Sequence, residues 1–384
     1  MESHAEAAIT FAAARPRGAG RFPLAGTLGL AARHAGLELV PEAARERVIW
    51  VAGRIPAALT RAAYLECRLR DGPDPVDLIF RVEKTGAEIL AGRNPMIGAG
   101  HLRGGGPAWN AVAALCGAWL DGGDSVWALV RHLWLELDLD APAAPGAPPV
   151  PAPSVFLAFD DDATSGMDAD ALLSMLDVVL APLIPGGMDA ASRTRLRGVL
   201  LRRPPGAAMP YAGIMFSRAR QAVRVYLSRV PGGSVPGLLD EVGWPEEETR
   251  DAARVLGELH AGVSPELGML HLDVLDGALL PRLGLEYTLQ RAPQVKGQVA
   301  ERAFVDRLVE CGLCRPERRD ALLAWPGYEV RTLRHELWPS WLIRRVNCIK
   351  LVHEPGREAQ AKAYLLAFHQ PYLRRAPAAE SGLR

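Results

Sequence analysis

Cationic and tyrosine side chains recur on segments of alternating polarity along this 384-residue chain. Two pairs have the form cation-x-tyrosine: Arg224-Val-Tyr226 and Lys362-Ala-Tyr364. Residues two apart on a strand point to the same side of the sheet, so each cation and its tyrosine would share one face. Such a cation can bind an anionic diphosphate, and the ring beside it can stabilise a carbocation and exclude water.

Further polar side chains on the same segments could join these pairs in one site. The candidate substrate-binding residues are Arg68, Arg81, Arg224, Tyr226, Tyr287, Lys350, Lys362 and Tyr364. A carboxylate on a neighbouring strand, Glu136 or Glu286, could orient or deprotonate an aromatic nucleophile, and we take Glu136 as the catalytic candidate. His271 also falls on a predicted strand. Lys350 and His353 lie three positions apart on one predicted strand and therefore point to opposite faces, so at most one of them can face the site.

A simpler interpretation gives these residues no ligand. Arg, Lys and Tyr are common on the solvent face of any antiparallel sheet, where cross-strand pairs contribute about 0.2–1 kcal/mol each. Ion pairs of arginines with Glu66, Glu83 or Asp138 would produce the same pattern in the sequence. The recurrence of the pattern in successive units favours a shared site.

The elements that must position these side chains are strands arranged in pairs. Alternating polarity interrupted by turn sequences predicts five such pairs. They are 61–70 with 76–84, 131–140 with 154–159, 211–218 with 222–230, 267–275 with 283–290, and 346–353 with 360–368. Helical sequence separates the pairs, which predicts an internal repeat of five ββ-helix units.

The predicted strands have one apolar face and one polar face. In the second pair, Leu133, Leu135 and Leu137 oppose Trp134 and Glu136. Amphipathic helices would cover the apolar face, which leaves two architectures. One is an open antiparallel sheet with its polar face in solvent, and the other is a closed barrel with helices outside and a polar lumen. Because closure removes exposed edges, we predict an α+β fold with a closed antiparallel barrel of about ten strands.

The domain organisation follows from these patterns. Residues 1–60 are predicted to form an N-terminal helical segment, and residues 61–375 the repeat barrel. Within the barrel, residues 141–153 read as a linker rich in Pro and Ala, and residues 376–384 as a flexible tail.

Composition excludes several classes of protein. The 44 Lys and Arg balance the 44 Asp and Glu, which argues against a generally basic nucleic-acid binder. No run of 18 apolar residues exists, and the N-terminus lacks the pattern of a signal peptide, so we expect a cytoplasmic protein without membrane contact. The abundance of Ala, Arg, Gly and Pro is typical of a GC-rich bacterial genome.

Metal and redox signals are weak. Cys311-Gly-Leu-Cys314 has no second cysteine pair, and its Gly312 is typical of a helix end. The run Asp160–Asp162 could hold Mg²⁺ through its carboxylates. The same run precedes a helical segment, where Asp is common as a turn former and N-cap, and we favour that role.

Five ββ-helix units with cation-x-tyrosine pairs on their strands resemble the aromatic prenyltransferases of the ABBA barrel type, over residues 60–370. The resemblance implies a ten-stranded antiparallel barrel whose lumenal Arg, Lys and Tyr hold an allylic diphosphate and screen the carbocation. By this resemblance Arg68, Arg224 and Lys362 match diphosphate-binding cations, Tyr226 and Tyr364 match shield tyrosines, and Glu136 matches the acid that engages the nucleophile. The resemblance implies no required cofactor, with Mg²⁺ optional.

The predicted function is a prenyltransferase that moves an allylic group from its diphosphate to an aromatic acceptor in bacterial natural-product biosynthesis. The acceptor is a small molecule or a peptide side chain. The alternative is a non-catalytic peptide-binding or scaffold barrel that partners a peptide-modifying enzyme, and a third option is another peptide-tailoring enzyme on such a fold. A lumen lined by cations and tyrosines would favour the transferase, whereas a lumen filled by Leu, Met and Phe would favour the binding barrel.

Overall fold

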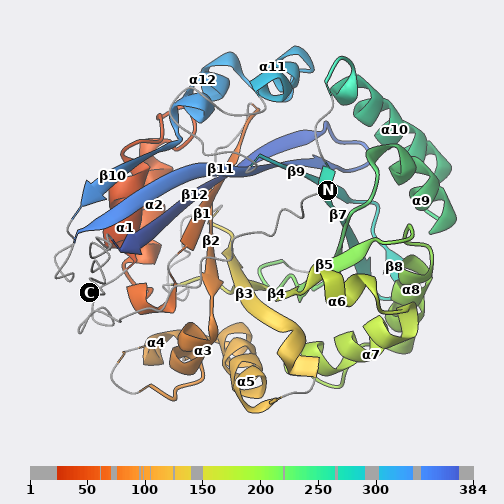
Figure 1. Cartoon of the computed structure of the whole chain (residues 1–384), viewed down its shortest axis with the longest axis horizontal. Helices are drawn as coiled ribbons and strands as arrows, with labels where there is room; N and C mark the ends of the chain where they lie inside the picture. The colour runs from red at the N-terminus through yellow and green to blue at the C-terminus, as the bar shows by residue number, and fades with distance from the viewer. Residues whose placement is uncertain are drawn as a thin grey trace, which may run out of the picture.

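Antiparallel strands form a closed ring that helices surround on the outside (Figure 1). The computed structural model describes residues 24–60, 62–70, 76–94, 97, 99–103, 105–123, 126–139, 150–218, 221–263, 267–289, 302–331 and 339–371. The predicted tail and most of the predicted linker lie outside these residues. The described part of residues 1–60 contains helices α1 (Ala25–Ala32) and α2 (Glu42–Ala52).

Ten strands make up the ring, in the order in which they follow one another along the chain. They are β1 (Ala62–Arg68), β2 (Val76–Val82), β3 (Val130–Leu137), β4 (Ser154–Phe159), β5 (Ala208–Ile214), β6 (Val223–Ser228), β7 (Leu267–Leu275), β9 (Leu283–Thr288), β11 (Ser340–His353) and β12 (Gln360–Pro371). All ten were predicted, and the bounds of β4 and β7 match the prediction.

The pairing of β12 with β1 closes the barrel. Its register runs from Ala62 opposite Phe368 to Arg68 opposite Lys362. On the far side of the ring, β9 pairs with both β7 and β11. The closed barrel is therefore confirmed, and the open-sheet alternative is wrong.

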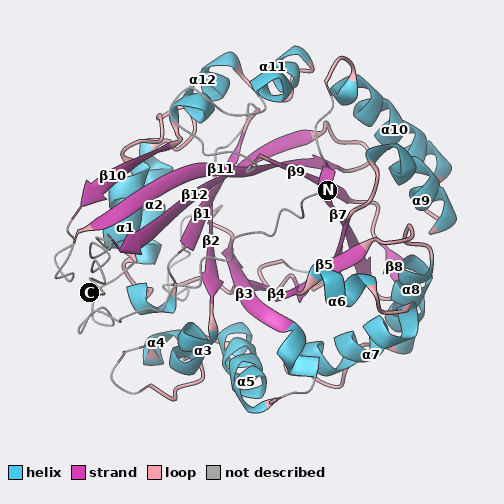
Figure 2. Ribbon diagram, viewed as in Figure 1, coloured by secondary structure: helices cyan, strands magenta, loops and turns pink. Residues whose placement is uncertain are grey.

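Two short strands extend the sheet beyond the ring (Figure 2). Strand β8 (Ala278–Leu279) pairs with β7, and β10 (Gly327–Arg331) pairs with the N-terminal half of β11. Neither was predicted. The first residues of β11, Ser340–Arg345, also lie ahead of the predicted strand.

Helices connect the strand pairs and cover the outer face of the barrel. They are α1 (Ala25–Ala32), α2 (Glu42–Ala52), α3 (Lys84–Leu90), α4 (Gly100–Arg103), α5 (Pro107–Asp121), α6 (Asp161–Ser165), α7 (Ala169–Leu180), α8 (Ala190–Leu201), α9 (Val235–Glu241), α10 (Glu246–His260), α11 (Arg302–Glu310) and α12 (Pro316–Ala324), with single 3₁₀ turns at Ala57–Leu59, Val126–Leu129 and Gly232–Ser234. Among the described helices, none is long and apolar enough to cross a membrane.

Helix α7 shows why these segments form helices. Its buried residues Leu172, Leu176 and Val179 recur at the spacing of one helical face, and the side chain of Asp168 accepts a hydrogen bond from the backbone N–H of Ala171 at 2.8 Å. The apolar face of such helices packs on the outer face of the strands. Leu133, for example, is fully buried there. The main hydrophobic core is thus a layer between helices and barrel, and the lumen is a separate space.

Candidate active site in the barrel lumen

Four strands carry an aromatic and a charged residue two positions apart on the inner face of the barrel. They are Tyr64 and Glu66 on β1, Trp134 and Glu136 on β3, Arg224 and Tyr226 on β6, and Lys362 and Tyr364 on β12. The aromatic residue comes first on β1 and β3 but second on β6 and β12, and these two pairs of strands run in opposite directions. All four charges therefore lie on one side of the four rings, toward the barrel end that holds the five hairpin turns.

The lumen is thus divided into two layers. We call the first the charged layer, composed of Glu66, Asp77, Glu136, Arg224, Asp273, Glu286, Lys350 and Lys362, all of which are buried. We call the second the aromatic layer, composed of Tyr64, Trp134, Phe156, Tyr211, Tyr226 and Tyr364. The lumen is therefore lined by cations and tyrosines and is not filled with Leu, Met and Phe.

Two cations of the charged layer are paired with carboxylates from neighbouring strands. Arg224 forms a bidentate ion pair with Asp273 of β7, at 2.6 and 2.8 Å, and only 1% of its side chain is exposed. Lys362 pairs with Glu66 of β1, across the strand pair that closes the barrel. Arg282 approaches Asp273 from the hairpin end at 3.6 Å. Each of these carboxylates thus neutralises a buried cation.

Lys350 is held differently. Its Nζ donates to the hydroxyl of Tyr364 at 3.4 Å, and in the described part of the chain no carboxylate oxygen lies within 4.0 Å of it. Burial and the nearby Arg224 lower the pKa of Lys350 to about 8, against the opposing effects of Glu286 and Glu66. Lys350 is therefore the cation of this layer with the most capacity for a new anionic partner.

Burial and neighbouring charges also shift the carboxylates. Burial raises the pKa of Glu286 to about 7, against the opposing effect of Lys350. Burial and the nearby Glu66 raise the pKa of Glu136. Burial alone would raise the pKa of Glu66, but Lys362 and Lys350 lower it below its usual range. Of these three carboxylates, Glu66 is held in its ionised form, whereas Glu136 and Glu286 take up a proton more readily than an exposed glutamate does.

The aromatic layer encloses a cavity of about 160 Å³. Its wall consists of the six rings of the aromatic layer together with Ile79, Glu136, Met269, Glu286, Asn347 and Cys348. The rings pack against one another: Tyr64 on Trp134, with centroids 5.0 Å apart, and Tyr226 between Phe156 and Tyr211. Its aromatic faces suit a flat ring and a short branched hydrocarbon chain.

His271 links the two layers on β7. Its ring lies against Tyr226 with centroids 3.9 Å apart, and its Nε2 is 3.1 Å from the carboxylate of Glu286. Burial and the nearby Lys350 and Arg224 lower the pKa of His271 well below its ordinary value. The imidazole is therefore neutral at pH 7 and supports Tyr226 and Glu286.

Two predicted binding residues lie away from the cavity. Tyr287 points outward between α10 and α11, where its hydroxyl lies 3.1 Å from His260 Nε2 and its ring packs on Phe304. Its role in substrate binding is thus a misassignment, because Glu286 takes the lumenal parity on β9. Arg81 lies at the opposite end of the barrel from the hairpin turns and pairs with Glu83 at 2.7 Å, as the solvent-face interpretation expects.

The other predicted residues lie at the hairpin end of the barrel, outside the lumen, or in its two layers. Arg68 is half-buried at the hairpin end, directly across from Lys362 in the ladder. His353 lies outside the lumen, with its Nε2 3.5 Å from Asp251 of α10, so Lys350 is the one of that pair that faces inward. Glu136, Tyr226 and Tyr364 line the cavity, and Arg224, Lys350 and Lys362 are buried in the adjacent charged layer.

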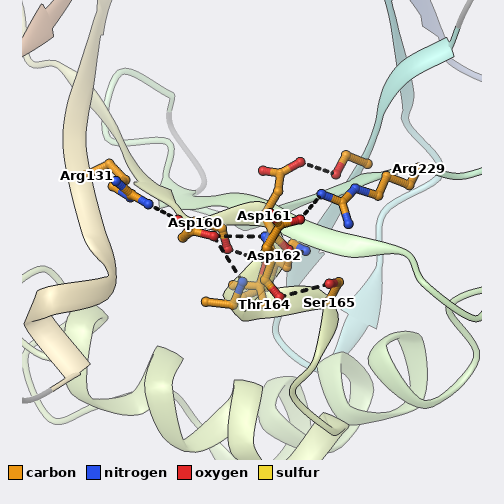
Figure 3. A network of polar contacts seen from close by, with 10 residues as sticks. Arg131, Asp160, Asp161, Asp162, Thr164, Ser165 and Arg229 are labelled. Atoms are coloured by element: carbon orange, nitrogen blue, oxygen red, sulfur yellow. Dashed lines mark hydrogen bonds and ion pairs between the residues drawn. The ribbon is translucent and has the colours of Figure 1, made fainter. Parts of the chain in front are cut away.

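The aspartate run is occupied by structural roles (Figure 3). Asp160 caps α6 by accepting from the backbone N–H groups of Asp162 and Ala163, and it also pairs with Arg131. Asp162 pairs with Arg229 at 2.5 Å. Asp161 accepts from Ser228, at 3.0 Å. Among the described residues, no group of three or more His, Cys, Asp or Glu side chains is arranged to hold a metal ion.

Several lumenal residues were not predicted as site residues. They are Tyr64, Glu66, Trp134, Phe156, Tyr211, His271, Asp273 and Met269. Tyr64 and Glu66 share strand and parity with Arg68, and Trp134 shares them with Glu136, whereas the other five lie on strands without a predicted site residue. A signal for some of them was present in the sequence. Tyr64-x-Glu66 and Trp134-x-Glu136 place the aromatic residue before the charged one, which is the reverse of the order in the two cation-x-tyrosine pairs.

Solved structures with the same fold are known. The crystal structure of the prenyltransferase PriB in its apo form matches with a TM-score of 0.51 and 17% identity, over 89% of this chain and 94% of that one. The PriB ternary complex with L-tryptophan and dimethylallyl thiolodiphosphate matches with a TM-score of 0.51 and 16% identity over the same shares. No protein-family model and no curated protein sequence matches.

Proposed function

We propose, because the chain has the barrel fold of the aromatic prenyltransferases, that it transfers an allylic group from its diphosphate to an aromatic acceptor in bacterial natural-product biosynthesis. The acceptor would be a small molecule or a peptide side chain. No cofactor is required in this proposal, and Mg²⁺ is optional. The supporting observation is the layered lumen, in which buried cations lie directly beside an aromatic cavity.

The two layers suit the two halves of an allylic diphosphate. The diphosphate would bind in the charged layer to Lys350, Arg224 and Lys362, which are charge-assisted donors. The hydrocarbon chain would extend into the aromatic layer, where Tyr226 and Tyr364 lie one pleat away. When the C–O bond breaks, its electron pair leaves with the diphosphate, and the rings stabilise the allylic cation while they exclude water.

Proton removal completes the reaction. The acceptor ring forms the new bond with the allylic cation and then loses a proton. Glu136 and Glu286 both border the cavity, so either can receive it. A carboxylate whose pKa lies near 7, as burial makes that of Glu286, is well matched to this step at neutral pH.

A diphosphate would enter a layer in which two cations already have partners. It would compete with Asp273 for Arg224 and with Glu66 for Lys362, whereas Lys350 needs to give up only its bond to the hydroxyl of Tyr364. We therefore expect Lys350 to contribute most to diphosphate affinity. Arg224 and Lys362 would contribute less, because Asp273 and Glu66 already neutralise their charges.

The same ion pairs favour a second candidate function. Because Arg224 and Lys362 are neutralised within the protein, the barrel could bind a ligand without transferring a group. In that case the chain would be a non-catalytic peptide-binding or scaffold barrel that partners a peptide-modifying enzyme.

Calorimetric titration with dimethylallyl and geranyl thiolodiphosphate, each with and without Mg²⁺, tests the proposal. We expect saturable binding with a Kd in the micromolar range, about −8 kcal/mol. Lys350→Met should weaken it at least ~10-fold, because a buried charge-assisted hydrogen bond contributes about 1.5–3 kcal/mol. The exposed Lys84 on α3 supplies the matched control, and Lys84→Met should bind like the parent protein. Flat titrations of a folded protein would reject the transferase and leave the binding barrel.

A further inference from the structure

Within the described residues, the cavity of the aromatic layer borders two carboxyl groups and no cationic side chain. Its wall contains two carboxylates, Glu136 and Glu286, while no Lys, Arg or His side chain of the described residues lines it. The lumen as a whole has the same bias. Its buried carboxylates are Glu66, Asp77, Glu136, Asp273 and Glu286, and its buried cations are Arg224, Lys350 and Lys362.

The two carboxylates face the cavity from opposite sides. Strand β3, which carries Glu136, and strand β9, which carries Glu286, are five positions apart in the ring of ten strands and hence diametrically opposed. The rings of Trp134 and Tyr226 belong to the same wall. A group placed in the centre of the cavity would therefore meet aromatic faces all round and an acid at either side.

Glu136 lacks the partner that a buried carboxylate normally has. It is 6% exposed, and within the part of the chain that the structure describes it forms no hydrogen bond and no ion pair. The carboxyl of Glu136 borders the cavity, so a ligand bound there could supply its hydrogen-bond donor. Glu286 has a single contact in the same region, the 3.1 Å approach of the neutral His271.

From these contacts we infer that the cavity binds an organic cation, an ammonium or guanidinium group carried by the acceptor. Aromatic faces attract such a cation through the ring quadrupole, with an energy of about 2 kcal/mol or more where the site is desolvated. The two carboxylates supply charge-assisted acceptors. That this ligand is the acceptor rests on the proposed function. That it carries a positive charge follows from the cavity alone.

A cationic acceptor also resolves the charge balance of the lumen. The buried carboxylates outnumber the buried cations by two, five against three. Burial raises the pKa of Glu136 and Glu286, and a positive acceptor between them would favour the ionised form of both. The nucleophile would then be the aromatic ring that carries the cationic group, since a protonated amine has no free electron pair.

Titration of Glu286 supports this inference. The charged groups that face it are Lys350 from β11, His271 from β7, Arg224 from β6, Glu66 from β1 and Glu136 from β3. The other titratable groups near it are Cys348 from β11 and the tyrosines Tyr64, Tyr211, Tyr226 and Tyr364, which are neutral at pH 6–8 because burial raises the pKa of each. With these neighbours, burial raises the pKa of Glu286 to about 7. A bound cation favours the ionised carboxylate, so its affinity should rise as the pH increases from 6 to 8.

The test is a calorimetric comparison of three ligands of similar shape and different charge. Tryptamine carries an ammonium group, its guanidino analogue carries a guanidinium group, and tryptophol is neutral. We expect at least one of the two cations to bind ~10-fold or more tighter than tryptophol, which corresponds to about 1.4 kcal/mol. The difference between the two cations shows which group the cavity prefers. Equal affinity for all three ligands would overturn the inference.

Isosteric variants locate the charge recognition. Glu136→Gln and Glu286→Gln should each weaken the preferred cation ~5-fold or more while tryptophol binding stays unchanged. Glu247→Gln, at an exposed position on α10, is the matched control and should match the parent protein. Circular dichroism verifies that the variants fold. Unchanged cation binding in both cavity variants would contradict the inference.

The same calorimeter separates this inference from the proposed function. If thiolodiphosphate binds and the cations bind no better than tryptophol, the transferase proposal stands and the cationic acceptor is rejected. If the cations bind selectively and thiolodiphosphate does not, the cavity is a cation site and the transferase proposal fails.

Discussion

The two faces of the barrel strands are buried equally well but are built from opposite chemistry. On β3, Leu133 and Leu135 are fully buried under the outer helices, while Glu136 on the inner face is only 6% exposed. The outer face gains stability from apolar burial and packing. The inner face carries buried charges, whose desolvation often outweighs their mutual attraction. Burial by itself therefore does not identify the hydrophobic core of this protein, and the inner face is explained by a ligand better than by stability.

The ion pair of Arg224 and Asp273 provides the strongest test of this difference. Asp273→Ala should destabilise the protein by about 3–5 kcal/mol, because it leaves a fully buried guanidinium without a partner. Chemical denaturation measures the effect. The double variant Arg224→Met/Asp273→Leu removes both charges and should be about as stable as the parent or more stable. If the double variant were as unstable as the single one, the inner face would be contributing to stability as the outer face does.

Replacement of Glu286 should give an intermediate effect that depends on pH. Burial holds the pKa of this carboxyl at about 7 in the folded protein, above the ordinary glutamate value of 4.5, so its protonated form favours folding. That contribution is complete below pH 4.5 and is lost as the pH rises through 7.

Glu286→Gln keeps a neutral group at every pH. Its stability relative to the parent protein should therefore increase from pH 5 to pH 8, by up to roughly 3 kcal/mol. Thermal or urea unfolding across this range measures the difference. A constant difference would show that Glu286 is ionised throughout and would weaken its role as a proton acceptor.

An exposed ion pair on the outer helices should give the smallest effect. Arg254 on α10 contacts Asp251 at 2.6 Å and Glu258 at 2.9 Å, a geometry as close as that of Arg224, yet its side chain is 59% exposed. Arg254→Ala should cost less than about 1 kcal/mol, since solvent screens exposed pairs. A loss comparable to that of Asp273→Ala would mean that burial does not account for the contrast between the two faces.

Much of the fold could be predicted because local patterns determine it. Strict alternation predicted β4 and β7 to the residue, and the apolar face predicted the outer helices such as α5 and α10. Helix α8 was not predicted, because its sequence AASRTRLRGVLL is rich in Arg and has only a weak apolar face. Strands β8 and β10 are too short for an alternating pattern of polar and apolar residues to be detected.

The site was harder to predict because its contacts are not local. Lys362 and Glu66 are 296 residues apart and meet only because β12 pairs with β1. The sequence identified which residues could be charged partners but not which ones the register brings together. Parity would have corrected one assignment: Tyr287 follows Glu286, and adjacent residues on a strand face opposite sides, so the two could not both enter the lumen.

Closure of the ring by β1 and β12 has a consequence for how the chain folds during synthesis. The pairing joins Ala62 to Phe368, so the barrel cannot close until nearly the whole described chain has left the ribosome. Until then the edge of β1 is unpaired, and unpaired edges promote association between chains. Contacts of such high sequence separation also make folding slow. The protein should therefore depend on chaperones more than an α/β protein of the same length whose sheet can grow strand by strand.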